Sequence, residues 1–281
     1  MKWFISIFFL FLSQLHIGQT IQQLEDSLIS ILRQVQTEKN TQLVEKYNNN
    51  FKATLDFVIK HPESFEYEFD SLSNFMSTVK SPDGIFRIFN WNIQQKNQTQ
   101  FYECWINKED GSVIKLKDHQ KTIPEIEFAI LSENSWFGAL YYKIIPVIKK
   151  NKTYYTLLGW DGNDMFSNKK IIEILEFKKS KLQFGNSMFV YPNQRTKKRV
   201  VLQYNKQSYM SLKHDKIRKE NYIIFDHLVP TSPHLKDFPD WYVTDLSFDA
   251  FKWDGARWTY IKDFDAKSLK ILRRPFNDPN K

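Results

Sequence analysis

After residue 62 the chain becomes a series of short segments rich in aromatic and β-branched residues, separated by tight turns. NKEDG separates FYECWI from SVIKLK within residues 101–117, KKNK separates two segments within residues 140–159, and DGA separates two more within residues 247–262. Each of these patterns is typical of a β-hairpin. Crossover helices do not alternate with the segments, which argues against a doubly wound parallel sheet. The sequence therefore predicts an α+β fold whose larger part is an antiparallel β-meander.

Two helical patterns precede the strands, and one more helix is expected among them. Apolar residues recur at helical spacing within residues 21–58, and Asn40 or Thr41 is placed to cap the second run. This pattern predicts an N-terminal helical pair, which packs on its own domain or serves as a structural partner for another protein. Residues 168–177 also carry isoleucine and leucine on one side of a helical pattern, with Ser167 as the expected N-cap. We therefore expect one helix inserted into the β-meander.

The first 18 residues have the form of a secretory signal peptide. Lys2 precedes a short apolar segment at residues 3–12, which is too short to span a bilayer. No later apolar run reaches the length of a membrane span. The sequence thus predicts an exported protein of the periplasm or the medium.

The remaining chain divides into a helical segment at residues 19–62, a mainly antiparallel β domain at residues 63–265 and a basic tail at residues 266–281. Cys104 is the one cysteine, so an internal disulfide is excluded. A packed core must stabilise the fold instead, and the 24 phenylalanines supply material for it.

Charge is unevenly distributed along the chain. Residues 19–141 contain 12 basic and 17 acidic residues, whereas residues 142–281 contain 27 basic and 15 acidic residues. A basic half is compatible with a polyanionic partner. However, lysine outnumbers arginine 32 to 8, and phosphate recognition favours arginine. Together with export, this usage favours a solvated basic surface, and we expect no nucleic acid partner.

The stretch WDGNDMFSN places Asp161, Asn163 and Asp164 close together between two elements. Their oxygens are ligands of the kind that calcium prefers. Met165 and Ile172 stand where an EF-hand loop requires two of its ligands, so the stretch is not an EF-hand. A looser calcium site is the alternative to a turn that joins two elements, and we expect the turn and no metal.

A second candidate is FDHL, which contains Asp226 and His227. Adjacent residues on a strand face opposite sides, so these two are not expected to pair with each other. No histidine spacing indicates a zinc site. A third candidate is an acidic run interleaved with aromatic residues, which fits a glycoside hydrolase, a sugar-binding surface or an aromatic core with acidic turns. The members of this run are Asp237, Asp240, Asp245, Asp249 and Asp254.

Several motifs follow one another over roughly residues 80–255: SPDGIFRIFNWN, YYTLLGWDGND followed by SNKKIIEILEF, Phe184-Gly185, FDHLVP and TDLSFDAFKW. Together these motifs resemble those of a family of uncharacterised exported proteins from Bacteroidota. Thr244 and Phe248 depart from the family pattern, in which proline and tyrosine stand at these positions. The resemblance implies a location in a Gram-negative envelope and brings no known activity, cofactor or catalytic residue.

These observations favour an exported, soluble, non-enzymatic protein that binds an unknown envelope or extracellular ligand. Its binding surface is expected to include the Asp161 loop and the basic C-terminal half. The alternative is a hydrolase of a sugar or ester linkage, with Asp161, Asp226, His227 and Asp245 as acids and bases. Convergence of these carboxylates in a pocket would favour the enzyme, and their dispersal would favour binding. Neither hypothesis requires a cofactor.

Overall fold

The computed structural model describes residues 19–120, 123–179 and 181–265. The expected signal peptide and basic tail lie outside the described residues. Within the described part of the chain, no helix has the length and apolar character needed to cross a membrane.

The two N-terminal helices form where the apolar spacing predicted them. Helix α1 spans Ile21–Thr37 and helix α2 spans Thr41–Ile59. Thr20 and Gln23 form a capping box at the start of α1, and Asn40 caps α2 by accepting two backbone N–H groups of its first turn. The buried stripes of both helices pack on the first β-sheet, so the helical pair contributes to the core of its own domain.

Three sheets follow the helices. The first contains β1 (Phe86–Gln94), β2 (Gln100–Lys108) and β3 (Val113–Lys117) in that order. The second contains β4 (Leu140–Lys149), β5 (Lys152–Asp161), β6 (Ser167–Lys178) and β7 (Lys181–Phe184), with β9 (Arg199–Asn205) also paired to β6. The third has the order β10 (Leu212–Ile217), β11 (Glu220–Pro230), β12 (Tyr242–Trp253), β13 (Trp258–Ile261) and β8 (Phe189–Val190). Short 3-10 helices in the connections include η1 (Leu72–Asn74), η3 (Ile126–Phe128), η4 (Pro233–Leu235) and η5 (Pro239–Trp241).

Antiparallel pairing dominates these sheets, and only the short ladder between β13 and β8 is parallel among the named strands. The three predicted hairpins are confirmed as β2–β3, β4–β5 and β12–β13. In the β4–β5 turn, Lys150 and Asn151 have φ angles of 51° and 58°, the left-handed geometry of a tight two-residue hairpin. The α+β class is therefore confirmed.

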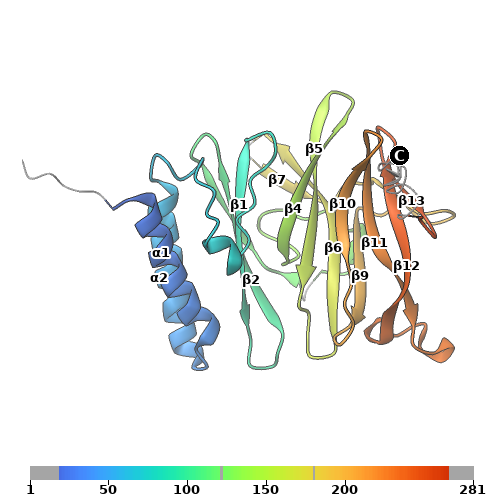
Figure 1. The fold of residues 1–281 in the computed structure, drawn as a ribbon, viewed down its shortest axis with the longest axis horizontal. Helices are drawn as coiled ribbons and strands as arrows, with labels where there is room; N and C mark the ends of the chain where they lie inside the picture. The colour runs from blue at the N-terminus through green and yellow to red at the C-terminus, as the bar shows by residue number, and fades with distance from the viewer. Residues whose placement is uncertain (1–18, 121–122, 180, 266–281) are drawn as a thin grey trace, which may run out of the picture.

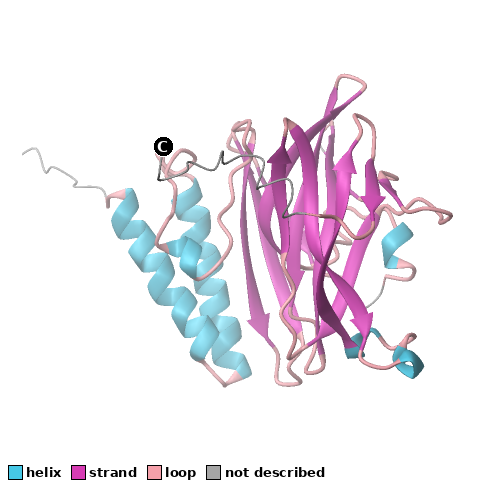
Figure 2. Cartoon of the chain, turned by 45° about the vertical axis from the view of Figure 1, so that its right-hand side comes forward, coloured by secondary structure: helices cyan, strands magenta, loops and turns pink. Residues whose placement is uncertain are grey.

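The helical pair and the three sheets lie one after another across the molecule, in chain order (Figure 1). A second view shows the helices on one side of the stacked sheets (Figure 2). Phe51 on α2 packs against Trp91 on β1, and Phe86 on β1 packs against Tyr155 on β5. A third apolar cluster, around Phe251, joins the second and third sheets. Each layer thus buries one face of the next.

The helix expected at residues 168–177 is wrong, because this segment lies within β6 in the middle sheet. Ile171 and Leu175 belong to the core shared with the first sheet, whereas Ile172 and Ile174 belong to the core shared with the third sheet. A strand that is buried on both faces carries a continuous apolar run instead of an alternating pattern. Periodicity cannot distinguish such a run from a buried helix.

A buried polar group lies within the same core. The Glu173 carboxylate forms an ion pair with Arg199 Nε on β9 at 2.6 Å, and both side chains are fully buried. Glu173 also accepts a hydrogen bond from the Tyr141 hydroxyl, which accepts one from the Trp136 indole at 2.7 Å. Burial, together with the Glu173 charge, raises the pKa of Tyr141 well above its ordinary value, so this phenol remains a donor. The two buried charges are therefore paired with each other, while Arg199 Nη2 is buried without a hydrogen-bond partner among the described residues.

Candidate functional site

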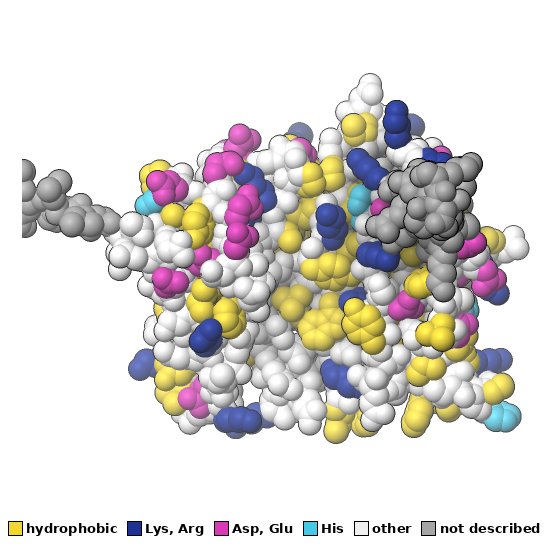
Figure 3. All heavy atoms as spheres, viewed as in Figure 1, with side chains coloured by type: hydrophobic (Ala, Val, Ile, Leu, Met, Phe, Trp, Pro, Cys, Tyr) yellow, Lys and Arg dark blue, Asp and Glu magenta, His cyan; other side chains and the backbone are white. Residues whose placement is uncertain are grey.

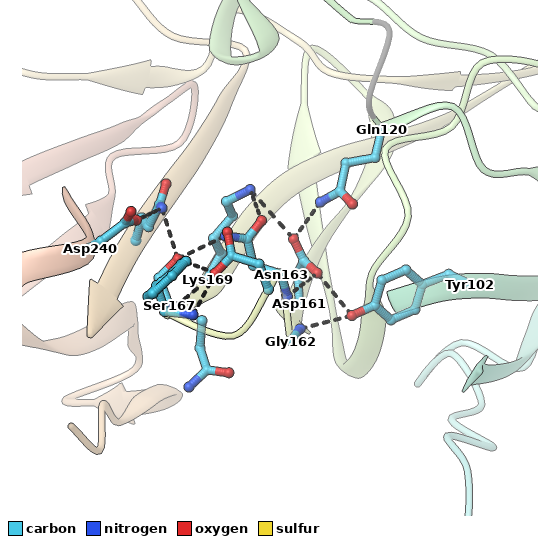
Figure 4. Close-up of polar contacts among 12 residues, drawn as sticks. Tyr102, Gln120, Asp161, Gly162, Asn163, Ser167, Lys169 and Asp240 are labelled. Carbon is cyan, nitrogen blue, oxygen red and sulfur yellow. Dashed lines mark hydrogen bonds and ion pairs between the residues drawn. The ribbon is translucent and has the colours of Figure 1, made fainter. Parts of the chain in front are cut away.

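Asp161 ends β5 at the contact between the first and second sheets, and it is fully buried. Its Oδ1 accepts hydrogen bonds from the Tyr102 hydroxyl at 2.9 Å and the Asn163 backbone N–H at 2.7 Å. Its Oδ2 accepts one from the Gln120 amide and lies 3.7 Å from Lys169 Nζ (Figure 4). Both carboxylate oxygens therefore have protein partners, and the residue joins structural elements instead of facing solvent.

The residues after Asp161 form a tight loop through their own side chains. Asp164 Oδ1 accepts the backbone N–H groups of Phe166 and Ser167, each at 2.9 Å. Asn163 has a φ of 40°, and its amide donates to Asp164 and Ser167 side-chain oxygens at 2.9 and 2.8 Å. Ser167 begins a strand, so its predicted role as a helix cap is wrong. Asn163 and Asp164 thus act as turn residues, which use short polar side chains to bond nearby backbone.

This loop is fastened to two other connections at the same end of the molecule. Gln203 on β9 donates to the Ser167 hydroxyl at 2.9 Å and to the Asp240 carboxylate in the β11–β12 connection. Lys206, in the β9–β10 connection, donates to the Gly162 carbonyl at 2.8 Å. The β5–β6, β9–β10 and β11–β12 connections therefore lie side by side, and Figure 4 shows Asp240 on the side of Ser167 opposite Tyr102.

Large apolar side chains project into solvent from these three connections. They are Met165, Phe166, Tyr209, Phe238 and Trp241, which are 51%, 59%, 82%, 57% and 52% exposed. We call these five residues the apolar loop end. Hydrophobic side chains along the lower edge of the molecule are visible in Figure 3. Single exposed apolar residues are ordinary, but five of them on neighbouring connections make this end a candidate interaction surface.

The sequence contains one indication of this surface, two apolar residues within the polar stretch WDGNDMFSN. Met165 and Phe166 are apolar residues inside a polar turn, and Phe166 contributes to the turn through its backbone N–H and not through its ring. Asp161 and Asp164, which the sequence offered as candidate ligands, instead accept the backbone hydrogen bonds that shape the loop, and the side chains of Met165 and Phe166 face solvent.

The candidate carboxylates Asp161, Asp226 and Asp245 do not converge. Asp226 lies on β11 in the third sheet, where its Oδ2 accepts the backbone N–H of Ser211 at 2.7 Å. Asp245 is exposed on β12, and hydrogen bonds from the hydroxyl and backbone N–H of Ser247 lower the pKa of its carboxyl. Among the described residues, no hydrogen bond or ion pair joins any two of the three carboxylates.

His227 finds a carboxylate on another strand. Its Nδ1 lies 2.7 Å from Oδ2 of Asp249, a buried member of the acidic run on β12. The Tyr260 hydroxyl donates to the same oxygen at 2.7 Å, and the Asp263 backbone N–H donates to Oδ1 at 3.2 Å. The adjacent Asp226 takes no part in this group, as the alternation of side chains along a strand predicted. Sequence reasoning named Asp249 but could not pair it with His227, because the pairing depends on the register of β11 and β12.

Within residues 19–120, 123–179 and 181–265, no group of three or more His, Cys, Asp or Glu side chains is placed to hold a metal ion. Asp161 and Asp164 already accept hydrogen bonds from protein donors, which competes with the looser calcium site considered as an alternative.

Comparison with known proteins yields no match to a family model, a curated protein or a solved structure. The resemblance of the motifs to exported proteins of Bacteroidota therefore stays a prediction.

Proposed function

We propose that this is a non-enzymatic binding protein of the cell envelope, which attaches to a lipid surface through the apolar loop end. The observation that carries the proposal is the exposure of five large apolar side chains on three adjacent connections. None of the five carries a charge, and tryptophan and tyrosine favour the boundary between lipid and water. They project from separate turns instead of lining one groove, which suits a deformable lipid surface better than a fitted protein pocket.

The polar residues beneath the loop end support this role by holding it in shape. Asp161, Asp164 and Gln203 bond the three connections to the sheets and to one another. A surface that is already ordered loses little conformational entropy when it binds. The candidate residues Asp161, Asn163 and Asp164 thus belong to the binding surface as its support and do not contact the ligand themselves.

The size of the apolar surface indicates reversible attachment. Complete burial of a large apolar side chain contributes about 1.5–3 kcal/mol. The exposed fractions of the five side chains amount to the equivalent of roughly three complete side chains, or roughly 5–9 kcal/mol before the entropic cost of association. This binding free energy is far below that of a membrane-spanning helix and is comparable to that of other peripheral anchors.

Co-sedimentation with phosphatidylethanolamine–phosphatidylglycerol vesicles tests the proposal. We expect the protein to sediment with vesicles, and we expect Phe166→Ser combined with Trp241→Ser to lower the partition coefficient about tenfold or more, since two apolar contacts are removed. Phe57→Ser is the matched control, because Phe57 is 62% exposed but lies on α2, away from the loop end. Absence of vesicle binding, or an equal loss in the control, would contradict the proposal. Self-association that only the double variant abolishes would identify the loop end as a protein interface instead.

A second candidate function, hydrolysis of an ester or sugar linkage, is favoured by the pairing of His227 with Asp249. A buried carboxylate on Nδ1 orients the imidazole and leaves Nε2 as a general base. Three residues of β12, Asp245–Leu246–Ser247, bulge opposite His227, and Leu246 has a φ of 71°. Bulges and strained residues of this kind recur beside active sites.

Hydrolysis of p-nitrophenyl acetate and of 4-methylumbelliferyl glycosides tests this second candidate. It requires turnover that His227→Gln and Asp249→Asn both abolish while the fold is retained. Turnover that survives in both variants, or no turnover by the wild-type protein, would contradict the hydrolase candidate. Binding would then be the one function that is still proposed.

A further inference from the structure

A groove of about 450 Å³ opens beside the start of β4 and the end of β5. Its walls are largely apolar and aromatic; they consist of Ser73, Phe75, Met76, Ser77, Thr78 and Val79 on one side and Leu140, Tyr142 and Trp160 on the other. Hydrophobic side chains gather in the middle of the same face of the molecule in Figure 3, over the lower ends of β4, β5 and β6. The volume lies within the range of small-molecule sites, which are apolar cavities with few polar groups.

The aromatic wall of this groove is held in place by the fold. The Tyr142 hydroxyl donates to the Leu212 carbonyl at 2.9 Å, which fixes its ring between the second and third sheets. Trp160 lies near the Tyr204 side chain on β9, and its indole opposes the rise in the Tyr204 pKa that burial causes. Tyr142 remains 36% exposed. The wall is therefore preformed and open, as a binding site for a small ligand requires.

Two cationic side chains lie next to the groove, each near the face of an aromatic ring that lines it. Lys170 is the direct cross-strand neighbour of Trp160, and its Nζ lies 5.1 Å from the centroid of the Tyr142 ring. On the other side, the Arg33 guanidinium lies 4.8 Å from the centroid of the Phe75 ring. Among the described residues, neither side chain forms an ion pair.

Lys170 is the more informative of the two cations, because it is only half exposed. Burial lowers the pKa of its ammonium, and the charge of Asp226 opposes this effect only in part. The Asp226 carboxylate is itself engaged by the Ser211 backbone N–H at 2.7 Å. A half-buried ammonium without a hydrogen-bond acceptor among the described residues is costly in a structural role and useful in recognition of an anion.

We propose that this groove binds a small amphipathic acid, with an aliphatic or aromatic body against Trp160 and Tyr142 and an acidic group toward Lys170. Arg33 provides a second cation at the Phe75 side. The charge of the flanking residues selects an acid over a neutral or cationic ligand of the same length, because an unpaired ammonium can donate to a partner of opposite charge only when the ligand is an anion. The inference is independent of vesicle attachment, since none of the five residues of the apolar loop end lines the groove.

Titration calorimetry with decanoate, decanol and decyltrimethylammonium, all below their micellar concentrations, tests the proposal. We expect decanoate to bind more tightly than the other two probes. Lys170→Met keeps the apolar stem and removes the charge, so decanoate affinity should fall about tenfold, the size of one charge-assisted contact, while decanol binding stays unchanged. Lys213→Met, at an exposed lysine on β10, is the matched control and should have no effect.

Leu140→Trp fills the groove and should abolish binding of every probe, and circular dichroism establishes that this variant is folded. Binding that survives in folded Leu140→Trp places the probes elsewhere and overturns the inference. Equal binding of the three probes, no heat with decanoate, or equal losses in Lys170→Met and Lys213→Met also overturns it. A dimer that Leu140→Trp dissociates would show that a second copy of the chain occupies the groove, and it would overturn the small-ligand proposal as well.

Discussion

The hydroxyl of Tyr102 on β2 donates a hydrogen bond to Oδ1 of Asp161 at the end of β5, at a distance of 2.9 Å. The Tyr102 hydroxyl oxygen in turn accepts a hydrogen bond from the backbone N–H of Gly162 at 2.8 Å. Burial, reinforced by the Asp161 charge, raises the pKa of Tyr102 far above its ordinary value, so the phenol stays protonated. The Tyr102 side chain of the first sheet thus holds both the Asp161 carboxylate and the Gly162 backbone, where the β5–β6 connection begins.

Tyr102→Phe should destabilise the protein by about 1–3 kcal/mol, because it leaves a buried carboxylate and a buried N–H without one partner each. The measurement is the free energy of unfolding in urea. Tyr242→Phe is the control, since its hydroxyl bonds the Lys236 carbonyl at an exposed position and its loss should cost less than about 0.5 kcal/mol. Equal losses in the two variants would mean that the Tyr102–Asp161 contact contributes nothing specific.

Calcium should leave the melting temperature unchanged, because the Asp161 and Asp164 oxygens already accept protein hydrogen bonds. Asp161→Ala should lower the melting temperature equally in chelator and in millimolar calcium, through loss of the joint between sheets. A ligand that binds only the folded state stabilises it by mass action. A calcium-dependent rise that both Asp161→Ala and Asp164→Ala remove would therefore establish a metal site and reject the structural role.

The ion pair between Glu173 and Arg199 offers a test by double-mutant cycle. Arg199→Met leaves the buried Glu173 carboxylate without its cation and should cost about 3–5 kcal/mol of unfolding free energy. Adding Glu173→Gln removes the unpaired charge and keeps an acceptor for the Tyr141 hydroxyl, so the double variant should be more stable than Arg199→Met alone. Additive losses in urea unfolding would show that the two charges do not depend on each other.

Cys104 should be inert in the folded protein. It is fully buried on β2, and burial raises the pKa of its thiol well above the ordinary value, which suppresses the reactive thiolate. We expect dithiobis(nitrobenzoic acid) at pH 8 to react with one thiol per chain in denaturant and with almost none in native buffer. Rapid labelling of the native protein would contradict the buried placement. Tyr102→Phe should increase the rate of labelling in proportion to the increase in the unfolded fraction of the protein, and not further.

The sequence predicted the two N-terminal helices and the hairpins because their signals are local. Asn40 caps α2 through its own side chain, and the turn at Lys150 and Asn151 follows from residues within the hairpin. The acids of WDGND also proved to be turn residues, since Asp164 bonds backbone only two and three positions away. Each of these features depends on contacts over a few residues, which is the range that a sequence pattern describes.

The tertiary structure alone decided the rest. Whether Ile171 to Leu175 form a helix or a strand depends on burial of both faces between two other sheets, and no local pattern contains that information. His227 meets Asp249 only because of the register between β11 and β12. Trp160, Tyr142 and Lys170 come together from three strands, and the residues of the apolar loop end come from three connections. The sequence by itself determined the N-terminal helices, the hairpins and their order along the chain, whereas packing between distant segments determined the conformation of residues 168–177 and which side chains share a surface.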